Sequence, residues 1–142
     1  MAKLDSLIRF HKHELEEHQK QLSELNSLAT KIEDDIDQIE QQMELEMEAS
    51  TKDPLLASTL PNYLKKCKDK KAELKLSLNF VEEKIIETTA IIRDKFAELK
   101  KYELVDQKRK DEEALKKQKF ENQELDEIGL DSHRRKHSNQ ED

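Results

Sequence analysis

Leucine and isoleucine recur along the first third of the chain at alternating intervals of four and three residues. Only two of the twelve positions in this first stripe are polar, and the stripe consists of Leu4, Ile8, His11, Leu15, His18, Leu22, Leu25, Ala29, Ile32, Ile36, Ile39 and Met43. A repeat of about 3.5 residues keeps one side of a helix facing a partner helix, as in coiled coils. The pattern predicts a first coiled-coil helix over residues 1–48.

A second stripe with the same spacing begins at Leu60 and ends at Tyr102. Ten of its thirteen positions are apolar, and the stripe consists of Leu60, Leu64, Cys67, Lys71, Leu74, Leu78, Val81, Ile85, Thr88, Ile92, Lys95, Leu99 and Tyr102. We expect Phe96 to replace its neighbour Lys95 in the stripe. The second stripe predicts a long second helix over residues 61–129.

Residues 49–60 separate the two stripes and have the composition of a turn with a short helical segment. Asp53 followed by Pro54 is typical of a helix N-cap and first helical residue. We expect Pro61 to start the long helix, capped by Ser58 or Thr59. Because the turn is too short to return the chain for a parallel arrangement, the two helices should form an antiparallel hairpin.

Charge supports the hairpin independently of the stripes. Residues 33–48 contain eight acidic residues and no base, whereas residues 65–71 contain five lysines and one aspartate. A hairpin brings these segments face to face, whereas a parallel homodimer would oppose acid to acid. With Leu4 opposite about Glu103, the second helix should be unpaired beyond about residue 105.

The end of the second helix has its own sequence signal in residues 125–130, Leu-Asp-Glu-Ile-Gly-Leu. It fits a Schellman motif with Gly129 in the left-handed conformation and Leu130 packed on Leu125. We expect residues 130–142 to form a disordered tail. The predicted fold is therefore all-α: an antiparallel two-helix coiled-coil hairpin with a longer second helix and a disordered C-terminal tail.

Composition argues against an enzyme. Charged residues make up 42% of the chain and hydrophobic residues 34%, which suffices for a narrow stripe but not for a thick core. Gly129 is the only glycine, so neither a Walker A loop nor a dinucleotide fingerprint is possible. His11, Glu14 and His18 could hold a metal in a bundle, but no matching cluster lies on the second stripe, and a polar layer that sets register is favoured. We expect no enzymatic activity, no cofactor and no metal.

The charge balance also bears on partners and location. The formal net charge of −7 opposes nucleic-acid binding, and Lys65 to Lys71 are better explained as partners of the facing acids. No apolar run is long enough for a transmembrane helix, and the first residues lack a signal-peptide core. With the lone Cys67, these features predict a cytoplasmic protein without direct membrane insertion. The basic residues 133–137 are expected to be solvated, with weak contact to a membrane surface or an acidic partner as the alternative.

Some apolar residues fall outside the stripes, on outer positions of the predicted heptads, among them Phe10, Leu45, Leu76 and Phe80. Leu76 and Phe80 are one helical turn apart, so they should share an exposed patch. A third helix, another protomer or a different protein could cover it. The alternative is that they are isolated exposed apolar residues, which are common on protein surfaces.

Four short segments resemble the flagellar FliJ family: Ser6-Leu7-Ile8-Arg9, Asp53-Pro54 followed by Tyr63, residues 99–103 (Leu-Lys-Lys-Tyr-Glu), and residues 125–130. The resemblance covers nearly the whole chain and implies a soluble component of the bacterial flagellar type III export apparatus, needed for flagellum assembly, motility and chemotaxis. It implies a coiled-coil stalk and chaperone that inserts the paired ends of its hairpin into the export ATPase ring. Other surfaces would contact the export gate membrane protein and flagellar cargo chaperones, so the protein could be peripheral at the inner face of the cell membrane.

The candidate partner-binding residues combine this resemblance with the exposed apolar positions. They are Arg9, Phe10, Leu76, Phe80, Phe120, Leu125, Asp126, Glu127, Ile128, Gly129 and Leu130. The family's enteric members have a more aromatic region near the turn, whereas the stretch after Tyr63 is lysine-rich here. The alternative function is a general cytoplasmic coiled-coil scaffold or homodimer, such as an injectisome stalk relative.

Overall fold

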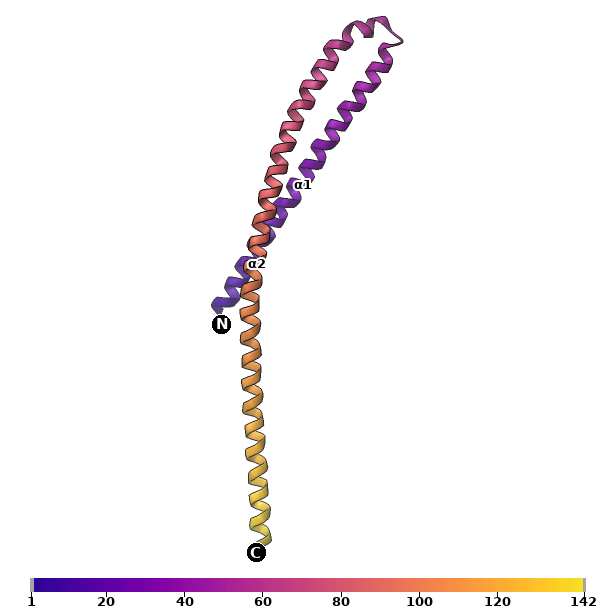
Figure 1. The fold of residues 1–142 in the computed structure, drawn as a ribbon. Helices are drawn as coiled ribbons and strands as arrows, with labels where there is room; N and C mark the ends of the chain where they lie inside the picture. Colours follow the sequence, from indigo (N-terminus) through magenta and orange to yellow (C-terminus); the bar gives the residue numbers. More distant parts are fainter. Residues whose placement is uncertain (1, 142) are drawn as a thin grey trace. The chain divides into compact units, whose positions relative to one another are not determined.

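The structure is a computed structural model that describes the backbone of residues 2–141 and the side chains of residues 3–137. It contains two helices, α1 (Ala2–Ser50) and α2 (Pro54–Glu141) (Figure 1). The chain divides into two units: a hairpin unit, His11–Ala97, and a terminal unit, Met1–Phe10 with Glu98–Asp142. The predicted fold class is confirmed, because α1 and the longer α2 pack against each other in an all-α hairpin.

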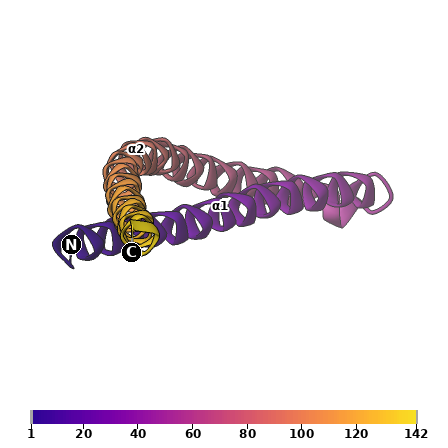
Figure 2. The same ribbon diagram turned by 90° about the horizontal axis from the view of Figure 1, so that it is seen from below.

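In the hairpin unit, α1 and α2 run antiparallel and lie side by side from the turn onward (Figures 1 and 2). Ala29, Ile32, Ile36 and Val81 form the buried core, and the half-buried residues packed against it are Leu25, Leu74, Leu78 and Ile85. Every position of both predicted stripes is buried or half-buried in the structure. The alternation of four and three residues is therefore confirmed as the contact line between the helices.

The turn is closed by hydrogen bonds at both helix ends. The Thr51 N–H donates to the Glu48 carbonyl at 3.2 Å, which ends α1. The Leu55 N–H donates to Asp53 Oδ1 at 3.0 Å, which satisfies one of the free donors at the start of α2. Asp53 is thus the N-cap and Pro54 the first helical residue, as predicted.

The predicted helix start at Pro61 is wrong, because α2 begins at Pro54 and continues through Pro61. Ser58 and Thr59 do not cap a new helix. Their hydroxyls donate instead to the carbonyls three residues earlier, at 2.8 and 3.1 Å, a bond that hydroxyls make inside helices. A proline removes one helical hydrogen bond, here the one to the Ala57 carbonyl, and α2 tolerates this loss close to its exposed N-terminus.

Two ion pairs between the helices set the register of the hairpin unit. Lys71 Nζ lies 2.6 Å from Glu40 Oε1, and Lys95 Nζ lies 2.8 Å from Glu14 Oε2. The predicted register placed Cys67 opposite Glu40 and Arg93 opposite Glu14. The helices are therefore displaced along each other by about one turn or less from the predicted register.

Lys95 stays in the second stripe, and the expectation that Phe96 replaces it is wrong. The Lys95 side chain is half-buried and its ammonium group reaches Glu14, whereas Phe96 is 50% exposed. A lysine can occupy a stripe position when its aliphatic stem covers apolar surface and its charge meets a carboxylate.

In the terminal unit, Ile8 and Leu99 are buried and Tyr102 is half-buried. The stripe extends slightly past the predicted limit near residue 105, because Asp106 and Arg109 are also half-buried. From residue 111 to residue 137 every side chain is exposed. This stretch of α2 has no helix packed against it within the described residues.

The predicted Schellman cap at Gly129 is wrong, because α2 stays helical to Glu141 and Gly129 has no positive φ. Leu125 and Leu130 are both exposed, so no contact between them ends the helix. A glycine inside a helix costs only about 1 kcal/mol relative to alanine, which the neighbouring turns can absorb. Residues 130–141, predicted as a disordered tail, are helical, and the described side chains of 130–137 are all exposed.

Candidate partner-binding surfaces

An open groove with apolar walls runs between α1 and α2 in the hairpin unit. It has a volume of about 530 Å³, and Leu28, Ile32, Leu74, Leu76, Ser77, Phe80 and Val81 line it; we name it the apolar groove. Leu76 is 71% exposed and Phe80 61% exposed, so the predicted shared patch is confirmed as an exposed surface. Lys84 Nζ lies 5.7 Å from the centre of the Phe80 ring, close enough for a cation–π contact.

Sequence reasoning missed Leu28, which belongs to the same surface. Leu28 is half-exposed on α1 and faces the groove across from Leu76 and Phe80. From the sequence, Leu28 can be recognised as a residue outside the stripe. The sequence does not show which residues of the other helix lie beside it. Only the register of the hairpin unit brings the three side chains together.

A second groove, named here the lysine groove, lies nearer the turn. It has a volume of about 310 Å³, and Ile39, Gln42, Tyr63, Lys66, Cys67 and Lys70 line it. A hydrogen bond with Cys67 raises the pKa of the Tyr63 hydroxyl, and the groove contains no carboxylate. It therefore offers two exposed ammonium groups beside neutral side chains.

The opposite edge of α1 is acidic. Glu33, Asp37, Glu40 and Glu44 follow one another at intervals of four, three and four residues, so they share one helix face. On this edge Lys71 binds Glu40, and this hydrogen-bonded ion pair lowers the pKa of the Glu40 carboxyl, with a further contribution from the charge of Lys75. The predicted facing of acids and lysines is thus confirmed for this edge, whereas Lys66 and Lys70 lie on the other.

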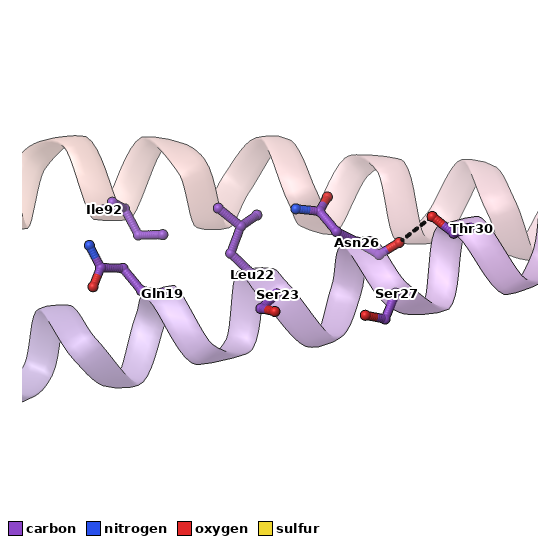
Figure 3. A pocket seen from close by; sticks show the side chains of 7 residues that line it. All are labelled: Gln19, Leu22, Ser23, Asn26, Ser27, Thr30 and Ile92. Atoms are coloured by element: carbon purple, nitrogen blue, oxygen red, sulfur yellow. Dashed lines mark hydrogen bonds between the residues drawn. The ribbon is translucent and has the colours of Figure 1, made fainter.

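A third groove of the hairpin unit is lined mainly by neutral polar residues of α1, with one apolar residue from each helix (Figure 3). It has a volume of about 650 Å³, and its lining residues are Gln19, Leu22, Ser23, Asn26, Ser27, Thr30 and Ile92. The Thr30 hydroxyl donates to the Asn26 carbonyl at 3.1 Å, drawn as the dashed line in Figure 3. With no titratable side chain in its lining, this groove places no acid or base beside the hydroxyls of Ser23, Ser27 and Thr30.

The three candidate metal ligands, His11, Glu14 and His18, are not gathered into a metal site in the structure. Glu14 is engaged by Lys95, and this hydrogen bond lowers the pKa of the Glu14 carboxyl. His11 is buried in the contact between the helices. Over the described part of the chain, no three His, Cys, Asp or Glu residues come close enough to hold a metal ion together.

The candidate residues near the two ends of the chain lie in the terminal unit. Arg9 and Phe10 are exposed on the first turns of α1, which share this unit with the residues from Glu98 onward. Lys110 is bonded to Asp106 at 3.0 Å; this contact raises the pKa of Lys110, and the charge of Asp5 on α1 adds to the effect. Arg109 is the last half-buried residue in the described part of α2, so the paired part of the terminal unit extends to about this residue.

The remaining candidates lie in the exposed part of α2. Phe120, Leu125, Asp126, Glu127, Ile128, Gly129 and Leu130 are all exposed. Helical spacing places Leu125 and Ile128 on one face and Asp126 and Leu130 on the other side. The structure thus does not bring the six residues of the predicted motif together as one surface.

No helix within the described residues has an apolar stretch long enough to cross a bilayer. Comparisons of the chain with protein-family models, with curated proteins and with solved structures find no match.

Proposed function

We propose that this chain is a non-enzymatic stalk and chaperone of the bacterial flagellar type III export apparatus, which engages the export ATPase ring and links it to the export gate. The resemblance of residues 6–9 and 125–130 to the FliJ family motivates the proposal. An antiparallel hairpin with a longer second helix is the architecture that this family implies.

The observation that carries the proposal is the exposed stretch of α2 beyond Lys110. Every described side chain from 111 to 137 is exposed, although Leu115, Phe120, Leu125 and Ile128 are apolar. A single helix without a packing partner gains little stability from its own sequence, so a protein surface that surrounds it would stabilise it. The channel of a ring-shaped ATPase provides such a surface.

A stalk of this kind needs no active site. If the ring binds the helix with different affinity in its different nucleotide states, then the helix shifts the balance between those states. Hydrolysis would accelerate when the helix favours the state that limits turnover. In this proposal the exposed apolar residues of the hairpin unit remain available for cargo chaperones and for the gate protein, and the stalk would be peripheral at the inner face of the cell membrane through these partners.

The test is ATP hydrolysis by the cognate flagellar export ATPase with and without the purified chain. We expect the full chain to stimulate hydrolysis and a chain that ends after Lys110 to lose the effect, because the truncation keeps the paired residues of the terminal unit. The matched control is Leu76→Ser with Phe80→Ser, which changes exposed apolar residues of the hairpin unit only. This control should stimulate as the unchanged chain does.

Absence of both binding and stimulation at micromolar concentrations would reject the stalk proposal. Equal stimulation by the truncated chain would move the contact to the paired residues around Arg9 and Phe10. If neither binding nor stimulation is found, a general coiled-coil scaffold is the better description, and the apolar groove is the surface that favours it.

A further inference from the structure

The apolar groove and the lysine groove lie end to end on one face of the hairpin unit. Gln42 follows Leu28 by two heptads, and Ser77 follows Lys70 by one, so the two grooves open along the same edges of α1 and α2. The resulting strip is apolar at Leu76 and Phe80 and basic at Lys66 and Lys70. A ligand for this strip needs apolar and acidic groups in the same order.

Four acids of α1, Glu33, Asp37, Glu40 and Glu44, lie on the edge opposite the strip, where Glu40 binds Lys71. Two other acids lie near the strip, because Asp35 is one heptad from Leu28 and from Gln42, and the charge of Glu46 acts on Tyr63 of the lysine groove. The structure records no ion pair for Lys66 or Lys70 with any described residue, and both side chains are exposed. The ammonium groups of Lys66 and Lys70 can therefore form ion pairs with carboxylates from outside the hairpin unit.

The chain itself carries a segment with the complementary pattern. Residues 120–131, named here the acidic segment, contain five acidic residues and no base. One face of this helical segment combines two exposed apolar side chains with three carboxylates, namely Leu125 and Ile128 with Glu121, Glu124 and Asp131. This face has the apolar and acidic groups that the strip requires.

We propose that the acidic segment of one copy docks on the two grooves of a second copy. Leu125 and Ile128 cover Leu76 and Phe80, while Glu121 extends toward Lys70. Running parallel to the α2 that it contacts, the docked helix matches the order of the strip, because in both segments the charged residues precede the apolar ones. The acidic segment is about 18 Å long at 1.5 Å per residue, shorter than the roughly 27 Å between residues 63 and 81.

Two copies are required because both partners of the contact belong to α2. A single chain could bring residues 76–80 and 125–128 together only by breaking this continuous helix. Two chains meet without that cost, and because the docked helix runs parallel to α2, each contact leaves one strip and one acidic segment free, so further copies add head to tail. The inference does not depend on a role in flagellar export.

The first test measures the mass of the full chain in solution by light scattering over a range of concentrations. We expect reversible self-association that weakens with added salt, because carboxylates and lysines contribute to the contact. A groove variant, Leu76→Ser with Phe80→Ser, and a segment variant, Leu125→Ser with Ile128→Ser, should each weaken association roughly tenfold or more. The control, Leu104→Ser with Leu115→Ser, changes equally exposed apolar residues outside both surfaces and should leave association unchanged.

An equal mixture of the groove variant and the segment variant provides a sharper test. Each variant keeps the surface that the other has lost, so the mixture should associate more strongly than either variant alone. All substituted residues are exposed, so circular dichroism should show the helix content of the unchanged chain in every variant.

A disulfide test uses Cys67, the only cysteine of the chain, which lines the lysine groove. Lys117→Cys, one turn before Glu121 on the docked face and level with Cys67 in this register, should form an intermolecular disulfide with Cys67 on mild oxidation. Asp126→Cys, on the other side of the docked helix, should form much less. A monomer at every concentration would overturn the proposal. Association that survives in both variants, or equal cross-linking of the two cysteine variants, would overturn it as well by assigning the contact to another surface.

Discussion

Replacing Ile36 by alanine tests whether the core of the hairpin unit holds the two helices together. Ile36 is 8% exposed and belongs to the buried cluster with Ala29, Ile32 and Val81. The substitution removes three carbon atoms, each worth about 0.8 kcal/mol of burial, so the transfer loss is about 2 kcal/mol. In thick cores a residual cavity raises such losses toward 5 kcal/mol.

The cavity contribution should be small here. No described side chain is less than 2% exposed, so the space that Ile36 leaves lies near solvent and the facing side chains of α2 can move into it. We therefore expect the free energy of unfolding to fall by about 2 kcal/mol.

The assay is urea unfolding of the full chain followed by far-ultraviolet circular dichroism, with Leu45→Ala as the matched control. Leu45 lies on the same helix and is 64% exposed, so its truncation should change stability by no more than about 0.5 kcal/mol. If Ile36→Ala and Leu45→Ala had equal effects, the packing of α1 on α2 through the predicted stripes would be refuted.

Three further predictions follow from local contacts. Asp53→Ala should destabilise the start of α2 by about 1 kcal/mol because the Leu55 N–H loses its acceptor, whereas Asp53→Asn should retain most of the stability; equal unfolding midpoints for both variants would reject the cap. Lys71 lowers the pKa of Glu40, so the contribution of this ion pair to stability is present above the ordinary pKa of 4.5 and is lost as the pH falls through the lower pKa of the folded state; Glu40→Gln should flatten the acid dependence of the urea midpoint, and an unchanged profile would contradict the linkage. Gly129→Ala should stabilise the helix locally by about 1 kcal/mol and so raise the helix content, because no neighbouring side chain lies within 4 Å of the added Cβ and φ is not positive. A loss of helix content would instead support the left-handed cap predicted from the sequence.

The sequence predicted the contact line of the helices well because that line depends on a single periodic property. Every stripe position, including His11 and Thr88, is at least half-buried, and Asp53 caps α2 as expected. The predicted helix start at Pro61 and helix end at Gly129 are wrong because a helix-breaking residue lowers the stability of a helix only locally and by a limited free energy. That cost is a few kcal/mol for proline and about 1 kcal/mol for glycine, and a long helix can absorb it.

The candidate surfaces were less predictable because they depend on the register between two helices. Leu76 and Phe80 could be paired from the sequence since they lie on one helix, one turn apart. Leu28 could not be added, because the predicted register was displaced from the one that Glu40 and Lys71 establish. The sequence also could not predict that Lys66 and Lys70 lie on the edge opposite Glu40, since this depends on which edges of the two helices meet.

The absence of any fully buried side chain within residues 3–137 has a consequence for how such a protein can change over evolutionary time. A position in a thick core is restricted by close neighbours on all sides, whereas a stripe position here has neighbours on one side and water on the other. Leucine, isoleucine, methionine or an occasional histidine or lysine can each satisfy it. Related chains could therefore keep the hairpin while exchanging most of their residues, and the spacing of the stripes would outlast recognisable sequence identity.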